Sequence, residues 1–344
     1  MLGLGCHVSI EIILHPQRAS RDELRQFLAD RQFKPTDHLW DWPKGSLNYH
    51  WFDHTHCRSF DGVEATIYPP SAEQQEKLGQ CEWALHTRTR AFASPADKEQ
   101  QNKIVRAARQ KFDGSFYNDW YGKNRYTQVE PDSRDAVARG IYLAYEFVTH
   151  NIRAVRHALP EPNEGLEKLV ATKLEALATA DPTRVLYNAL VPFSVAALEH
   201  FFSQCFKILL RYDPRARERL KQQTRKIDLA DVLAIKAGTK TIEDVIADWY
   251  SFQNIASIHT AFSDWFGIDF WKLLRRRRKI GRRIALLESH LNQLIEFRHG
   301  IVHRLSLNIE LRKPQIEELL DIALAIIDTF VDHLEKGMGK SIRD

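Results

Sequence analysis

A stretch near the middle of the chain, residues 185–210, constrains the fold most because it is apolar on nearly every side. Its large apolar side chains are Phe193, Val195, Leu198, Phe201, Phe202, Phe206 and Leu209. A helix of this kind is stable only where other elements surround it, so the stretch predicts the central helix of a bundle. Glu199 and His200 interrupt the apolar surface, and a carboxylate in such a helix needs a partner.

Strand patterns are confined to the first part of the chain. Alternating runs rich in β-branched residues predict strands at residues 7–14, 47–52, 62–68 and 82–92. Ser20, with Glu23 three residues later, predicts the N-cap of one helix, and Ser94–Pro95 predicts the start of another that reaches about Lys111. We therefore expect an α+β sheet domain over residues 1–131, with helices on one face of the sheet.

From residue 132 onward the strand patterns disappear and helical spacing takes over. We expect helices at 133–157, with Ser133 as the cap, and at 165–180, 185–210, 229–236, 241–249, 255–265, 284–305 and from Lys313–Pro314 onward. Residues 132–344 are thus predicted to form an all-α domain, a helical bundle.

Composition limits the class of protein. The apolar content of 44% and charged content of 27% are ordinary for a soluble globular protein, and the net charge of +4 permits nucleic-acid binding without requiring it. The four cysteines, Cys6, Cys57, Cys81 and Cys205, form no CxxC pair, so we expect reduced thiols and a cytoplasmic protein. We expect neither an export leader nor a membrane span, since no apolar run of about 18 residues stands out.

The helix predicted for residues 284–305 has an unusual apolar face. Its apolar members are Leu287, Leu291, Leu294, Ile295, Val302 and Leu305. Arg298 falls at the centre of this face. Burying an unpaired guanidinium costs several kcal/mol, so Arg298 should meet a carboxylate, a phosphate or a second chain, and Glu199 is the first candidate. His299 and His303 are four residues apart and share a flank of the helix.

The spacing from Arg298 to His303 resembles the signature of HEPN-domain ribonucleases, in which an arginine precedes a histidine by a few residues. The stretch from Tyr250 to Trp271 is similar to the RiboL-PSP-type branch of that superfamily, and the resemblance covers about residues 185–336. It implies an HEPN-like helical core and a metal-independent endoribonuclease with no cofactor. It further implies a homodimer with a composite site, acting as a toxin or anti-phage effector with a possible antitoxin or defence partner.

In that reading each motif residue has a role. His303 is the general base or acid for the 2′-hydroxyl, and Arg298 grips the phosphate. His299, where the family often carries asparagine, orients the site or supplies a second acid. Five residues turn a helix by about 140°, so Arg298 and His303 diverge unless Gly300 loosens the helix or two protomers pool their motifs.

Two alternatives to an active nuclease stay open. One is a catalytically silent bundle that binds nucleic acid or a partner protein, with Arg298 in a structural ion pair. The other is the binding half of a toxin and antitoxin pair.

Three further clusters have more than one interpretation. The basic residues Arg275, Arg276, Arg277, Arg278, Lys279 and Arg304 are expected to bind the RNA backbone, or else to be a solvated loop or partners for acidic neighbours. Residues 114–126 are either a stacking surface for bases or a turn-rich strand pair. Residues 50–57 hold ligand-type side chains, but without a second cluster we expect exposed strand-end histidines instead of a metal site.

Overall fold

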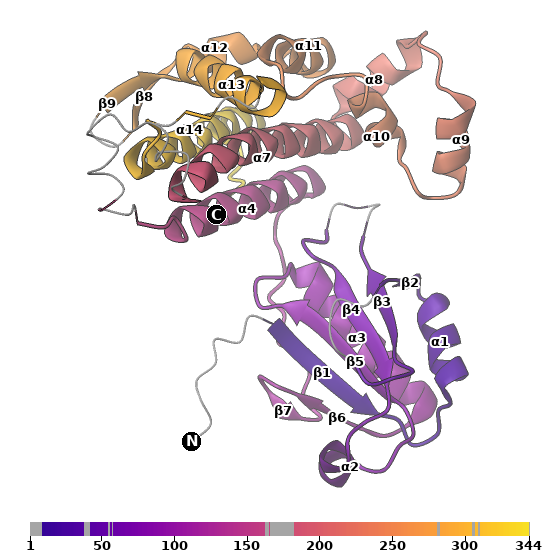
Figure 1. The fold of residues 1–344 in the computed structure, drawn as a ribbon. Coiled ribbons are helices and arrows are strands. Elements are labelled where there is room, and N and C mark those ends of the chain that lie inside the picture. Colours follow the sequence, from indigo (N-terminus) through magenta and orange to yellow (C-terminus); the bar gives the residue numbers. More distant parts are fainter. Residues whose placement is uncertain are drawn as a thin grey trace. The chain divides into compact units, whose positions relative to one another are not determined.

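The computed structural model describes residues 9–37, 42–53, 56, 58–161, 165, 182–280, 283–304, 307–308 and 310–343. The chain divides into two units, Met1–Ala136 and Val137–Asp344, each with its own core (Figure 1). The helix predicted for residues 165–180 lies outside the described residues except at its first position.

The first unit is built on a seven-stranded sheet with the order β2-β3-β4-β5-β1-β6-β7, in which every neighbouring pair is antiparallel. The strands are β1 (Ser9–His15), β2 (Lys34–Pro35), β3 (Leu47–Trp51), β4 (Val63–Tyr68), β5 (Ala84–Arg90), β6 (Ser115–Asn118) and β7 (Gly122–Lys123). The helices are α1 (Arg21–Ala29), α2 (Ala72–Leu78) and α3 (Pro95–Phe112). The predicted α+β architecture is confirmed.

Alternation along the strands separates an apolar face from a polar face. On β1, Ile10, Ile12 and Leu14 are buried, and α1 and α3 complete the core on that side. Gln101 of α3 ties the helix to the sheet, because its Nε2 donates to the carbonyl oxygens of Ile10 and Thr87 at 3.0 and 3.1 Å. The opposite face of the sheet keeps its polar side chains.

Local signals located the start of both packed helices. Ser20 and Glu23 form the predicted capping box of α1, and Ser94 caps α3 through the backbone N–H of Asp97. The aromatic segment at 114–126 forms β6 and β7, a strand pair at one edge of the sheet. The sequence did not predict β2 or α2, which are short.

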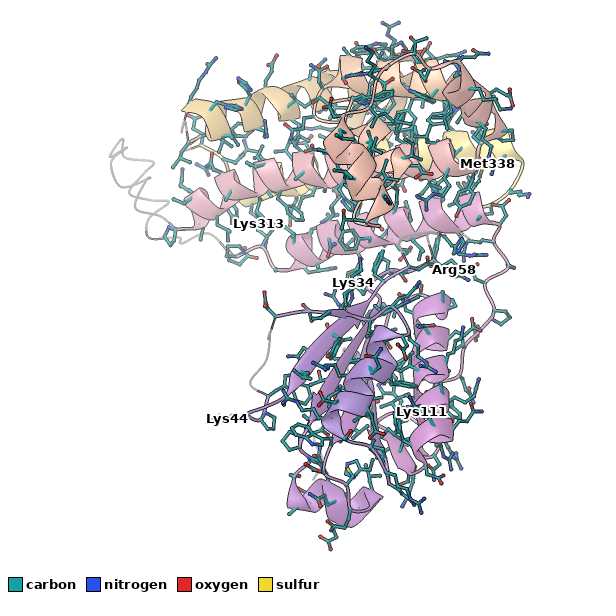
Figure 2. All side chains as sticks on the ribbon, turned by 90° about the vertical axis from the view of Figure 1, so that its right-hand side faces the viewer. Lys34, Lys44, Arg58, Lys111, Lys313 and Met338 are labelled. Atoms are coloured by element: carbon teal, nitrogen blue, oxygen red, sulfur yellow. The ribbon has the colours of Figure 1, made fainter. Side chains whose placement is uncertain are left out.

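The second unit is organised around α7, which confirms the predicted central helix. Its helices are α4 (Ala136–His157), α7 (Pro182–Tyr212), α8 (Pro214–Gln222), α9 (Leu229–Lys236), α10 (Ile242–Ala247), α11 (Ile255–Phe266), α12 (Phe270–Leu274), α13 (Leu287–Arg304) and α14 (Lys313–Met338). Figure 2 labels Lys313 and Met338 at the two ends of α14. Because α4 begins at Ala136, Ser133 is not its N-cap.

Phe202 of α7 joins the elements that surround this helix. Its ring lies 6.2 Å from Phe262 of α11, 5.0 Å from Phe270 of α12 and 5.3 Å from Phe330 of α14, measured between centroids. All four rings are buried and meet edge to face or at a small tilt, as aromatic cores prefer. Among the described helices, α7 alone is long and apolar enough to cross a membrane, a test that the core helix of a soluble protein also passes.

One predicted helix boundary was wrong, and the second unit is not entirely helical. Residues expected to begin the helix at 284 instead form β9 (Arg283–Leu286), which pairs antiparallel with β8 (Arg277–Ile280). The strand pair packs along α14 through Arg278, a tertiary contact that local helix propensity does not register.

We expect Phe202→Ala to lower the free energy of unfolding by about 3–5 kcal/mol, because it leaves a cavity among three other buried rings. Leu229→Ala is the matched control, since Leu229 of α9 is 72% exposed. Urea unfolding followed by circular dichroism measures both variants. Equal stability of Phe202→Ala and the control would contradict the central role of α7.

Candidate functional site

The Arg-to-His motif lies in the second half of α13, a helix that packs against α7 and α14. Leu287, Leu291 and Leu294 in its first half are buried. Beyond them the same face emerges toward solvent, and Val302 is 43% exposed. The apolar stripe predicted along the whole helix is therefore a core face only as far as Leu294.

Arg298 is half-buried and has no hydrogen bond or ion pair with any described residue. The expected pairing with Glu199 is not formed. Glu199 instead accepts a hydrogen bond from Nε2 of Gln253 at 2.7 Å. A carboxylate partner would be needed if Arg298 were fully buried. Because the guanidinium is only half-buried, it keeps part of its hydration and can remain unpaired.

His299 and His303 lie side by side on the exposed flank of α13. Their ring centroids are 4.4 Å apart with the planes inclined by 43°. Both side chains are exposed, as is Arg304 one residue later. Contact between the rings restricts the rotation of His303, while its exposure leaves the imidazole accessible to a substrate, as a general base must be.

Gly300 does not loosen the helix. Residues 298–304 are all α-helical, so Arg298 and His303 keep the divergence of about 140° that a regular helix imposes. A Cβ atom added to Gly300 would meet no described atom within 4 Å. The motif residues could face one site if Gly300 loosened the helix or if two protomers pooled their motifs. The helix of one chain is not loosened.

Two neighbouring cavities lie along α13. They have volumes of about 540 and 510 Å³ and share Gln293, Phe297 and Asn308 as lining residues. Gln293, Phe297 and Gly300 occupy one side of the helix, and His303 follows Gly300 within about 60° of it. The sequence did not single out these lining residues. Their spacing of four and three residues, which places them on one side of a helix, was the signal that could have identified them.

The basic run divides into paired and unpaired residues. Arg278 faces α14, where its guanidinium pairs with the carboxylate of Asp332 and its Nε donates to Oγ1 of Thr329 at 3.1 Å. Burial raises the pKa of Asp332, but hydrogen bonds from Arg278 and Arg343 outweigh it, so the net pKa lies below the ordinary value. Arg278 is therefore held in a structural ion pair.

The other members of the run are more accessible. Nε of Arg275 lies 3.3 Å from Glu288, and Arg276 is half-buried. Arg277 and Lys279 alternate with Arg278 on β8, are exposed, and form no hydrogen bond or ion pair within the described ranges. These two cations are free to contact a polyanion.

Several residues of the cluster at 50–57 form hydrogen bonds within their own loop. Asp53 is buried, accepts from the backbone N–H of His56 at 3.0 Å and pairs with Nε of Arg58 at 2.8 Å. Nε2 of His50 contacts the carbonyl oxygen of Asp61 at 2.8 Å. His54 and Cys57 lie outside the described residues, and the described part of the chain contains no group of three side chains arranged to hold a metal.

Comparison with known families concerns the C-terminal half of the chain. The model of the RiboL-PSP-HEPN family matches residues 166–336, which include α7 and α11 to α13. Searches of curated proteins and of solved structures found no match. The C-terminal part of the chain, residues 166–336, therefore belongs to the RiboL-PSP-HEPN family.

Proposed function

We propose that the second unit is a metal-independent endoribonuclease that cleaves RNA through the 2′-hydroxyl. The observation that carries this proposal is the pair Arg298 and His303 on the emerging half of α13, where neither forms an ion pair with a described residue. An accessible arginine and histidine supply the two functions that phosphodiester cleavage without a metal needs.

The reaction follows from the chemistry of these side chains. His303 takes the proton of the 2′-hydroxyl, and the 2′-oxygen attacks the adjacent phosphorus. The bond from phosphorus to the 5′-oxygen breaks, and protonation of that oxygen by an imidazolium gives a 5′-hydroxyl and a 2′,3′-cyclic phosphate. Arg298 neutralises the charge that builds on the phosphoryl oxygens. His299, in ring contact with His303, is the second acid or orients the base.

A second copy of the chain would bring the two functions together. The 140° divergence separates Arg298 from His303 on one helix, whereas a twofold axis beside α13 would place Arg298 of one protomer near His303 of its partner. Val302 supports this arrangement, because it is 43% exposed and lies about 40° from Arg298 on the helix surface. The proposed active form is thus a homodimer with a composite site.

The cellular role we propose follows the family resemblance. A ribonuclease that needs no cofactor would damage its own cell unless restrained, which fits a cytoplasmic toxin or anti-phage effector held by an antitoxin or another defence partner. A second candidate function is a non-catalytic bundle that binds nucleic acid or a protein. The observation favouring it is that one chain presents Arg298 and His303 in different directions.

The catalytic prediction concerns His303. We expect the full chain to degrade RNA but not DNA, equally with and without EDTA, and His303→Ala to lower the cleavage rate by about 10²-fold or more because the general base is lost. His157→Ala, an exposed histidine at the end of α4, is the control. A labelled-RNA assay measures the rates. Undiminished cleavage by His303→Ala, or loss of cleavage with EDTA, would contradict the mechanism.

The binding prediction separates exposed from paired cations. Neutralising Arg277 and Lys279 together should weaken RNA binding and reduce the slope of log affinity against log salt by about 1.4, since each lost contact to single-stranded RNA removes about 0.7. Cleavage at saturating RNA should survive. Arg278→Ala should instead lower the melting temperature, because Asp332 then keeps only Arg343 as an ion-pair partner and Thr329 loses its donor. An unchanged salt slope would assign Arg277 and Lys279 to a solvated hairpin.

The assembly prediction tests the composite site. Mixing inactive His303→Ala with inactive Arg298→Ala under conditions of subunit exchange should restore about a quarter of wild-type cleavage, since half of the dimers are mixed and each holds one intact site of two. Analytical ultracentrifugation of the same samples measures the dimer fraction. A monomer that cleaves RNA at micromolar concentration would exclude the composite site.

A further inference from the structure

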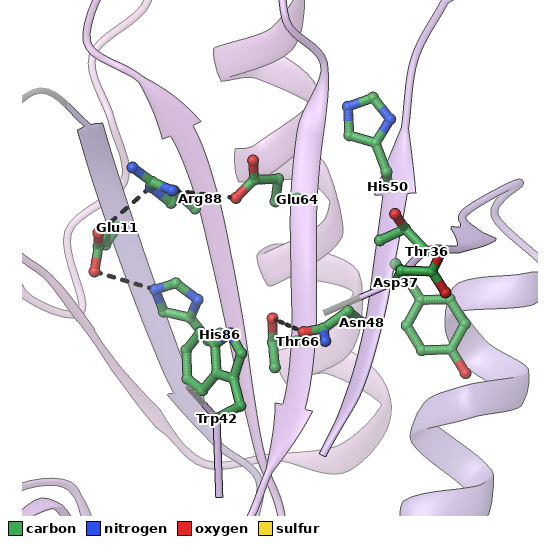
Figure 3. A pocket seen from close by; sticks show the side chains of 11 residues that line it. Glu11, Thr36, Asp37, Trp42, Asn48, His50, Glu64, Thr66, His86 and Arg88 are labelled. Carbon is green, nitrogen blue, oxygen red and sulfur yellow. Dashed lines mark hydrogen bonds and ion pairs between the residues drawn. The ribbon is translucent and has the colours of Figure 1, made fainter. Parts of the chain in front are cut away.

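A separate cavity of about 460 Å³ lies on the polar face of the N-terminal sheet, opposite α1 and α3 (Figure 3). Its volume is in the range of small-molecule sites. The residues that decide its chemistry are Glu11, Asp37, Trp42, Glu64, His86 and Arg88. Nothing in the proposed ribonuclease mechanism uses them.

Arg88 is already compensated by two carboxylates. The strand register places Arg88 of β5 opposite Glu11 of β1 and Glu64 of β4. Nε of Arg88 lies 3.6 Å from Oε1 of Glu11, and a terminal nitrogen lies 3.4 Å from Oε2 of Glu64. With Asp37, the described residues of the lining include three carboxylates for one guanidinium. An anion would therefore meet net negative charge and an arginine that is occupied.

His86 is a buried polar side chain in the cavity lining. It is 5% exposed, and its Nε2 lies 3.2 Å from Oε2 of Glu11. The hydrogen bond from His86 lowers the pKa of Glu11 to about 2 against the effect of burial, so Glu11 is a carboxylate and accepts from Nε2 of His86. Figure 3 shows the second ring nitrogen on the side away from Glu11. Within the described ranges this nitrogen, Nδ1, forms no hydrogen bond.

Trp42 adds an aromatic wall to these acceptors. Its ring lies 5.2 Å from the ring of His86 and 5.0 Å from that of Tyr68, between centroids. The side chain of Glu64 is 45% exposed, and its Oε1 has no partner among the described residues. An indole face beside carboxylates is the combination that attracts nitrogen cations.

We propose that this cavity binds a small organic cation bearing an ammonium or guanidinium group. One cationic group donates to Glu64, a second cationic group of a ligand such as agmatine donates to Asp37, and the indole ring of Trp42 covers the ligand. Arg88 fixes Glu11 and Glu64 in place between strands and does not contact the ligand charge directly.

The test is isothermal titration calorimetry of the full chain with agmatine, which carries a guanidinium and an ammonium group. Wild-type protein should bind it at one site, and Glu64→Gln should weaken the affinity roughly tenfold, since a charged hydrogen bond becomes a neutral one. Trp42→Leu should weaken binding through loss of the ring. The matched control is Glu73→Gln on the exposed helix α2, whose affinity should equal that of wild type.

Three results would overturn the proposal. They are no agmatine binding at millimolar concentration, equal affinities of Glu64→Gln and Glu73→Gln, and competition of inorganic phosphate for the agmatine site. Thermal unfolding of each variant checks the fold. Asp37→Asn serves as the second variant if Glu64→Gln unfolds, because Asp37 is exposed and has no described partner.

Discussion

The burial of α7 is the constraint on which the second unit depends. A helix that is apolar on almost every side is unstable in water. Burial of its apolar surface by the neighbouring helices is the main favourable contribution to the folding free energy of this unit. The rings of α11, α12 and α14 meet Phe202, and α13 packs its leucines on the same helix. The motif is positioned because the first half of α13 belongs to this core.

Partner geometry decides which cations are structural and which are available. Arg278 and Arg298 have the same chemistry, yet Arg278 is bound to Asp332 on α14 while Arg298 has no described carboxylate beside it. A paired guanidinium is costly to disturb, because its removal leaves a carboxylate without compensation. An unpaired one at the edge of a core keeps its donors for a phosphate. Arg298 is such an unpaired guanidinium, and it is the residue proposed to bind the phosphate.

The sites proposed in the two units differ in the charge of their side chains. In the second unit, Arg277, Lys279 and Arg304 are exposed and suit a polyanion. In the first, carboxylates line the cavity on the sheet, and Glu64 is available to a donor. The ligands proposed for the two units therefore differ in charge.

The sequence by itself determined the elements whose signals are local or periodic. The capping box at Ser20, the α+β first unit and the burial of α7 followed from nearest-neighbour chemistry and apolar spacing. Tertiary structure alone decided the hairpin at Arg277–Leu286, the hydrogen bond of Glu199 to Gln253 and the point at which α13 leaves the core. Each of these depends on contacts between side chains that are far apart in the sequence. Helical or strand periodicity contains no information on such contacts.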